Sequence, residues 1–541
     1  MYRSFSSLIL FLLATVSVLQ AQAPFPTRFD LREVNGVDFV TAVKSQQGGT
    51  CWTHGAWSAA EGNLLMTGAW EQAGEVGEPN LAEYHLDWWN GFNTFNNDDA
   101  PGTTEGLAIH YGGDYLVTAA YLSRGEGAVR EIDGQSFDTA PERQLPGYHR
   151  YYAREIIWMT MDDELNGIDR IKRAVMDYGV VGTAMCYAAN FLQGTVHYQP
   201  PTDASDPNHA VAIIGWDDEK ATQAPLPGAW LIKNSWGSGW GEAGCFWISY
   251  YDKTSCRHQE MGAVSFRGVD PLPYDRIYAH DYHGWRATFQ NVNQAFNRFV
   301  ADGAQSIAGL SFYTAADAVD YSATVYRHFN GTELFDPLTT VTGAEEQRGL
   351  HTVDLTTPIP VQAGDTFYVA VTLSGGGHAY DRTSSVDVLL GVLQGAAIVP
   401  SVSHPGESMY MVNGQWFDLY EWEDVPWPAR TANFCIKALA KESGPSAVDP
   451  LATAATPVLH QNYPNPFNPS TFIPFTLPQR MWCRLSVMNV HGEIVAVPAQ
   501  GEFDAGTHRA MFDAGDLPAG VYVSTLITER GSIMKKMVLV K

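Results

Sequence analysis

A cysteine stands at the start of a stretch that is expected to form a helix. In "SQQGGTCWTHGAWSAAEG" (45–62), Cys51 follows two glutamines and two glycines, and small or apolar residues recur after it three and four apart. That spacing predicts a helix that begins at Cys51. A thiol at a helix N-terminus meets the positive end of the helix dipole, which favours the reactive thiolate.

A nucleophilic thiol needs a general base, and the base needs a group that orients it. The sequence offers His209 in "DPNHAVAIIGWDD" and Asn234 in "WLIKNSWGSGWG". Each lies at the edge of a short apolar run that is typical of a buried strand, where a side chain can project into a cleft. Cysteine, histidine and asparagine together indicate acyl transfer through a thiol.

The elements that would position these residues differ along the chain. Up to about residue 266, helical and strand patterns alternate; "IDRIKRAVMDYG" (168–179) has helical spacing and ends on glycine. From about residue 270 to 440, short alternating runs such as "SATVYRHF" (322–329) and "TFYVAVTL" (366–373) lie between glycine-rich and proline-rich turns. This second pattern predicts an all-β sandwich.

Three blocks, "VKSQQGGTCW", "NHAVAIIGWDD" and "IKNSWGSGWGE", resemble the signature blocks of the papain family of cysteine peptidases, in the family's order. Segments around 28–33, 81–86 and 111–122 extend the resemblance over residues 28–255. It implies an α+β catalytic domain over residues 24–267, with a helical half and a β-barrel half.

The resemblance implies a role for each matching residue. Cys51 would be the nucleophile, His209 the general base and then acid, and Asn234 the group that orients the imidazole. Trp236 would shield the His209–Asn234 hydrogen bond from water.

Further residues would stabilise the transition state and bind substrate. Gln46 would donate its side-chain amide to the oxyanion, together with the backbone N–H of Cys51. Gln46 is preferred over Gln47 because it matches "VKSQ". Gly112 and Gly113 would let a substrate backbone approach and pair like a strand.

The chain also departs from the family pattern. Gly48 stands where a structural cysteine is usual, so the family's disulfide from that position is absent. There is almost no room for a propeptide before "RFDLRE". The six cysteines leave pairing open; Cys245 and Cys256 are the closest pair after Cys51 is set aside.

Two modules follow. Residues 268–440 resemble the lectin-like β-sandwich of some bacterial papain relatives, and the aromatic run 416–428 could form either a sugar-stacking face or core. Residues 441–458 have linker composition. Residues 459–541 resemble the C-terminal sorting domain of type IX secretion in Bacteroidota, a small Ig-like β-sandwich, which implies the secretion machinery as a partner.

The first residues and the charge indicate the compartment. Arg3 precedes the apolar run 8–19, and "AQA" (21–23) fits a signal peptidase site, so residues 1–23 are expected to be a signal peptide. No later stretch predicts a transmembrane helix. The net charge of −26 argues against nucleic acid and anionic membrane surfaces as partners. We expect export through the periplasm and outer membrane, to the cell surface or the medium.

The sequence therefore predicts a secreted cysteine endopeptidase that forms a thioester acyl-enzyme with protein or peptide substrates, without cofactor or metal. The alternative is a surface adhesin that binds glycans and keeps a papain-like scaffold. A transglutaminase-like acyl transferase would usually carry aspartate in place of Asn234. His54, one turn after Cys51, is expected to be a packed residue, and "FNNDDAPG" (95–102) a solvated turn rather than a calcium loop.

Overall fold

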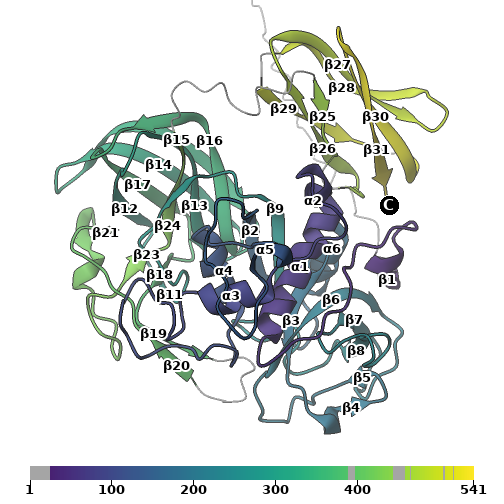
Figure 1. Ribbon diagram of the computed structural model, residues 1–541, viewed down its shortest axis with the longest axis horizontal. Coiled ribbons are helices and arrows are strands. Elements are labelled where there is room, and N and C mark those ends of the chain that lie inside the picture. The colour runs from purple at the N-terminus through teal and green to yellow at the C-terminus, as the bar shows by residue number, and fades with distance from the viewer. Residues whose placement is uncertain are drawn as a thin grey trace, which may run out of the picture.

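The computed structural model describes residues 25–387, 396–442, 457–462, 465–503, 506–515 and 517–540. The expected signal peptide and most of the expected linker lie outside the described residues. Figure 1 shows a central group of helices with strands below it, a large β-sandwich beside it and a small β-domain set apart at the C-terminal end.

The helices lie between residues 51 and 178 and form the centre of the molecule (Figure 1). They are α1 (Cys51–Thr67), α2 (Ala69–Gln72), α3 (Glu83–Trp89), α4 (Tyr115–Ser123), α5 (Glu131–Gly134) and α6 (Ile168–Tyr178), with 3-10 turns η1 (Leu31–Glu33), η2 (Ala189–Phe191) and η3 (Leu419–Glu421). The helices expected from Cys51 and from residues 168–179 are both confirmed. Among the described residues, no helix combines the length and apolarity needed to cross a bilayer.

Helix α1 is buried on nearly every side because small residues let its neighbours approach closely. A Cβ atom added at Gly55 would lie 2.6 Å from the hydroxyl of Tyr115 on α4. One added at Gly62 would lie 2.5 Å from Cγ2 of Val180, just before a strand. The small residues that follow Cys51 therefore allow α1 to pack closely against α4 and against Val180.

One continuous sheet runs through the part of the chain that resembles papain (residues 25–271, called the papain-like part) and into the sandwich. Its strand order is β10-β24-β13-β16-β2-β9-β3-β6-β7-β8-β5-β4, and β1 pairs with β6. The strands are β1 (Arg28–Asp30), β2 (Tyr151–Met159), β3 (Val181–Met185), β4 (Leu192–Gln193), β5 (Val196–His197), β6 (His209–Asp217), β7 (Ala229–Lys233), β8 (Cys245–Ser249), β9 (Ala263–Pro271), β10 (Arg276–Tyr278), β13 (Gln305–Thr314), β16 (Gly349–Val361) and β24 (Ile436–Glu442).

The two larger parts meet at β2. This strand pairs with β9 on one edge and with β16 of the sandwich on the other, where Gly349 is opposite Ile157 and His351 is opposite Glu155. The boundary expected between residues 267 and 268 falls inside β9. The papain-like part and the sandwich thus share backbone hydrogen bonds as well as side-chain packing.

The second layer of the sandwich is a sheet in the order β15-β14-β17-β12-β21-β22, packed over a core of its own. Its strands are β12 (Gln294–Val300), β14 (Val319–Phe329), β15 (Leu334–Glu345), β17 (Thr366–Leu373), β21 (Ser408–Val412) and β22 (Gln415–Asp418). Smaller pairings join β11 (Ala287–Phe289), β18 (His378–Asp381) and β23 (Asn433–Phe434), and β19 (Ser384–Asp387) with β20 (Ala396–Val399). The expected all-β sandwich is confirmed.

The aromatic run 416–428 contributes to packing. Trp416 packs edge-on against Phe296, with ring centroids 4.7 Å apart. Trp422 packs against Phe289 at 4.4 Å. Of the two roles left open by the sequence, these contacts favour core and interface over a sugar-stacking face.

The stretch 95–102 is only partly the solvated turn that the sequence predicted. Asn96 and Asn97 are buried, and Nδ2 of Asn97 donates a 2.9 Å hydrogen bond to the carbonyl of Pro400 in the sandwich. The prediction was wrong here because the turn is covered by a segment about 300 residues further along the chain.

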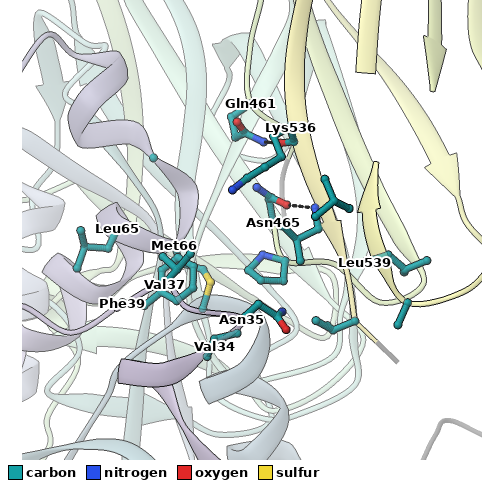
Figure 2. A pocket seen from close by; sticks show the side chains of 17 residues that line it. Val34, Asn35, Val37, Phe39, Leu65, Met66, Gln461, Asn465, Lys536 and Leu539 are labelled. Carbon is teal, nitrogen blue, oxygen red and sulfur yellow. Dashed lines mark hydrogen bonds between the residues drawn. The ribbon is translucent and has the colours of Figure 1, made fainter. Parts of the chain in front are cut away.

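The C-terminal domain is a small sandwich of two sheets, β25-β26-β29 and β28-β27-β30-β31. Its strands are β25 (Val458–Leu459), β26 (Ser470–Leu477), β27 (Met481–Asn489), β28 (Ile494–Phe503), β29 (Gly506–Asp513), β30 (Gly520–Thr528) and β31 (Gly531–Leu539). A cavity of about 590 Å³ lies between this domain and the papain-like part. Figure 2 shows Phe39 and Met66 on one side of it and Asn465 and Leu539 on the other. The C-terminal domain has its own core and does not close tightly against the rest of the chain.

Candidate active site

The structure brings Cys51, His209 and Asn234 to one place through three elements. Cys51 is the first residue of α1, His209 is the first residue of β6, and Asn234 directly follows β7, which pairs with β6. Helix α1 packs on β6, so the backbone N–H of Ala210 donates a hydrogen bond to the sulfur of Cys51. The thiol therefore lies beside the residue that follows the histidine.

The imidazole of His209 is held by Asn234 and covered by Trp236. Nε2 of His209 lies 2.7 Å from Oδ1 of Asn234, and the ring of Trp236 stacks on the imidazole with centroids 4.4 Å apart and planes at 19°. Because an amide oxygen only accepts, Nε2 carries the proton and Nδ1 is left free to act as a base. The geometry thus agrees with the roles expected of all three residues.

Burial decides the charge of the unliganded pair. Burial raises the pKa of Cys51 to about 12, although the backbone N–H groups of Ala210, Trp52 and Cys51 itself act in the opposite direction. Burial also lowers the pKa of His209 to about 4, against the hydrogen bond to Asn234, which raises it. The helix N-terminus contributes in the expected direction, whereas burial favours the neutral thiol and the neutral imidazole.

Gln46 is oriented by the loop that carries Asn234. Its Oε1 accepts a 2.6 Å hydrogen bond from Oγ of Ser235, and its backbone N–H donates to the carbonyl of Ser235 at 2.8 Å. Its Nε2 donates one hydrogen to the carbonyl of Gly48 at 3.0 Å, which leaves the second amide hydrogen for another acceptor. The side chain of Gln47 is exposed. The structure thus places Gln46 against the loop that carries Asn234, and the choice of Gln46 over Gln47 stays a prediction.

A buried ion-pair cluster anchors the segment that carries Gln46. Nζ of Lys44 lies 2.8 Å from Glu61 on α1 and 2.6 Å from Glu83 on α3. The carbonyl of Lys44 accepts from the N–H of Gly237, one residue past Trp236. The oxyanion segment is thus tied both to the helices and to the loop after β7.

The two glycines expected to face substrate also have structural reasons to be glycine. Gly112 has a φ of 119°, in the region that side chains disfavour. A Cβ added at Gly113 would lie 2.6 Å from Cε2 of Trp52. Their contact with substrate remains a prediction.

At Gly48, where the resemblance would imply a structural cysteine, the chain packs against the backbone of His110. A Cβ at Gly48 would lie 3.0 Å from the carbonyl oxygen of His110, and the N–H of Gly49 donates to that oxygen at 2.7 Å. The imidazole of His110 is fixed in turn by Asp87, whose Oδ2 lies 2.5 Å from Nδ1. Cysteines in the described part of the chain are all unpaired and buried, including Cys245 and Cys256.

Sequence reasoning missed the residues that hold the site in place. Ser235 orients Gln46, and Asn208 forms two hydrogen bonds with the backbone of Tyr187, at 2.7 and 3.0 Å, directly before His209. Ser235 directly follows Asn234, and Asn208 directly precedes His209. This position next to a motif residue was the sequence signal that could have identified them. His54 is the packed residue that was expected, since it is buried and its Nδ1 lies 2.8 Å from the carbonyl of Thr50.

Three family models match the chain in the order that the sequence predicted. A papain family cysteine protease matches residues 148–266, a lectin like domain matches 277–440, and a secretion system C-terminal sorting domain matches 461–541. The papain match includes His209 and Asn234 but begins after Cys51. The chain therefore carries a papain-like cysteine peptidase region, a lectin-like domain and a sorting domain, which confirms the resemblance.

Curated relatives match the papain-like region. Pro-cathepsin H of Bos taurus is 27% identical over 241 residues, which is 42% of this chain and 62% of the relative. Cathepsin K of Mus musculus is 25% identical over 242 residues, or 42% of this chain and 61% of the relative. The chain thus spans about three fifths of the length of these relatives.

Solved structures match the papain-like part and the sandwich together. The clostridial cysteine protease Cwp84, solved after propeptide cleavage, has a TM-score of 0.58 at 23% identity, and the match covers 77% of this chain and 99% of that one. The cysteine protease and lectin-like domains of Cwp84 from Clostridium difficile have a TM-score of 0.60 at 22% identity, and the match covers 78% of this chain and 90% of that one. These matches confirm the multidomain fold.

Proposed function

We propose that the protein is a secreted cysteine endopeptidase that hydrolyses peptide bonds through Cys51, His209 and Asn234. The observation that carries this proposal is the 2.7 Å hydrogen bond from His209 to Asn234 under the ring of Trp236, beside a thiol at the N-terminus of α1. It supports a base that is already oriented and a nucleophile beside Ala210, the residue that follows this base.

In the first half of the reaction, Sγ of Cys51 attacks the substrate carbonyl carbon while Nδ1 of His209 takes the thiol proton. The carbonyl oxygen becomes an oxyanion, which the backbone N–H of Cys51 and Nε2 of Gln46 stabilise. The C–N bond then breaks, and His209 returns the proton to the leaving amine. The product is a thioester on Cys51.

In the second half, His209 takes a proton from water, and the water oxygen attacks the thioester. The C–S bond breaks, the carboxylic acid product leaves, and Cys51 recovers its proton. Asn234 keeps the imidazole in one orientation in both halves, because Nε2 stays bonded to its amide oxygen.

Export is the second part of the proposal. The match to a secretion system sorting domain over residues 461–541 supports type IX secretion through the periplasm and outer membrane, to the cell surface or the medium. The C-terminal domain has a core of its own and contributes no residue to the candidate active site, which supports a role in sorting rather than in catalysis.

The test is the variant Cys51→Ala, measured on a peptide library and by labelling with an epoxide inhibitor. We expect loss of turnover and of label, with an unchanged circular dichroism spectrum. Cys483→Ala is the control, because it removes another buried thiol from the C-terminal domain and should keep both activity and label. Turnover near the parent level in folded Cys51→Ala would refute the proposal.

A further inference from the structure

A buried cluster of two carboxylates and one imidazole lies where the papain-like part meets the sandwich. Asp99 belongs to the loop between α3 and α4, His283 to the connection after β10, and Asp381 is the last residue of β18. Figure 1 shows this loop beside β11 and β18. The side chains of His283 and Asp381 are fully buried, and that of Asp99 is 15% exposed.

The three side chains converge without bonding to one another. Nδ1 of His283 lies 3.9 Å from Oδ2 of Asp99 and 4.0 Å from Oδ2 of Asp381, too far for hydrogen bonds. The three ligand atoms all lie within 4.8 Å of one another. Atoms that share a metal ion at about 2.1 Å are separated by about 3 to 4 Å, which is close to this arrangement.

The orientation of His283 turns a hydrogen-bond acceptor, Nδ1, toward the carboxylate oxygens of Asp99 and Asp381, which are acceptors as well. Its Nε2 is bonded to the carbonyl of Gly91 at 3.1 Å, so Nε2 carries the hydrogen and Nδ1 has only a lone pair. Within the described residues, Nδ1 of His283 and Oδ1 of Asp381 are buried and have no hydrogen-bond partner. A buried polar atom without a partner is costly, and a cation between the three groups would satisfy Nδ1 of His283.

Hydrogen bonds from neighbouring groups hold both carboxylates in place, and Oγ of Ser401 lies 3.4 Å from Oδ2 of Asp381 as well. Oδ2 of Asp99 accepts from Oγ of Ser401 at 2.8 Å and from the N–H of Val402 at 2.7 Å. Oδ2 of Asp381 accepts from the backbone N–H of His283 at 3.0 Å. Hydrogen bonds of this kind orient the ligands of metal sites, where their loss weakens metal binding.

Two cationic side chains near the cluster, those of Lys437 and Arg124, are bound to other groups. Lys437 is paired with Asp281, and the guanidinium of Arg124 is bonded to the carbonyls of Tyr282 and Asn90.

We propose that Asp99, His283 and Asp381 bind one divalent metal ion of the zinc class, which links the papain-like part to the sandwich. One imidazole nitrogen and two carboxylate oxygens are a donor set that suits Zn²⁺, with water as the fourth ligand. Calcium prefers six to eight oxygen ligands, which this site does not supply. The proposal replaces the sequence-based expectation that the chain takes no metal.

The test uses the full chain with Cys51→Ala, because the thiol and His209 are zinc ligands in their own right. After treatment with a chelator, equilibrium dialysis against Zn²⁺ with elemental analysis should give one ion per chain, and zinc should raise the thermal midpoint. Asp99→Asn and His283→Ala in this background should each weaken binding by about tenfold or more and remove the shift in midpoint.

His351→Ala is the matched control, because it removes another buried histidine of the sandwich without touching the cluster, and it should keep the zinc. Asp99→Asn keeps the size and shape of the side chain at a partly exposed position, so this variant should fold. It therefore still tests the site if His283→Ala does not fold. Absence of one-to-one binding in the parent, equal binding in Asp99→Asn, or binding of Ca²⁺ but not Zn²⁺ would each overturn the proposal. None of these results depends on peptidase activity.

Discussion

Oγ of Ser235 donates a 2.6 Å hydrogen bond to Oε1 of Gln46, so the residue after the orienting asparagine also holds the side chain expected to stabilise the oxyanion. The amide is thereby fixed with its nitrogen turned away from Ser235. One loop, the one after β7, thus contacts both His209 and Gln46, the residues proposed as the base and the oxyanion donor. The sequence block that contains Gln46 and the block that contains Asn234 are therefore linked in the structure by direct hydrogen bonds.

Gln46→Ala should lower kcat on the order of 100-fold or more with a smaller change in KM, because the oxyanion forms only in the transition state. Gln47→Ala should stay near the parent value, since its side chain is exposed. Steady-state kinetics on one peptide substrate compares the two. A larger effect from Gln47→Ala would show that the alignment of this block is off by one residue.

The acid limit of activity should lie near pH 4. His209 acts as a base only when neutral, and because burial lowers its pKa to about 4, kcat/KM should hold from about pH 7 to about 5 and fall below that. Trp236→Ala exposes the imidazole to water, so its pKa should rise and the limit should move up toward about 6.5. A parent limit already near the ordinary histidine value in the pH profile would argue against a dry site.

Asn234→Ala should lower kcat by roughly 10- to 100-fold and leave measurable activity, because the imidazole can still reach the thiol in a less populated orientation. The rate at which a small alkylating agent modifies Cys51 checks the thiol separately. That rate should change less than turnover does. Complete inactivity of a folded variant would mean that Asn234 does more than orient the ring.

Gly113→Ala should destabilise the protein by about 1–3 kcal/mol, because the new methyl group would overlap the ring of Trp52. Gly147→Ala is the control, since no atom lies within 4 Å of the added carbon there. Thermal and denaturant unfolding measure both. If Gly113→Ala keeps its stability but raises KM, the glycine serves substrate approach rather than packing.

Deleting residues 457–541 should leave kcat/KM unchanged in the purified protein, because the domain removed has its own core and contributes no residue to the candidate active site. In a host with type IX secretion, the shortened protein should remain in the periplasm. Fractionation with activity assays tests both parts. Secretion of the shortened protein would refute the sorting role, and loss of activity would refute the separation.

Local sequence was sufficient for much of the site. The small residues after Cys51 predicted α1, and the apolar runs at His209 and Asn234 predicted β6 and β7, because helical and strand periodicities are properties of the sequence itself. The order of the three blocks then predicted which side chains meet.

Contacts between distant segments could not be predicted in this way. The pairing of β2 with β16, the burial of Asn97 under Pro400 and the approach of Asp99 to His283 all join segments that no local pattern relates. Ser235 could have been suspected only from its place next to Asn234. The tertiary fold decides such contacts.

The pairing of β2 with β16 has a consequence for anyone who prepares the catalytic part alone. Cutting the chain after β9 would remove β16 and leave the backbone groups of residues 155–157 open along one edge of the sheet. An uncovered edge strand is a template for strands of other copies of the chain. The isolated catalytic part would therefore tend to self-associate and precipitate. In the full chain, β16 of the sandwich covers this edge and so protects it from such association.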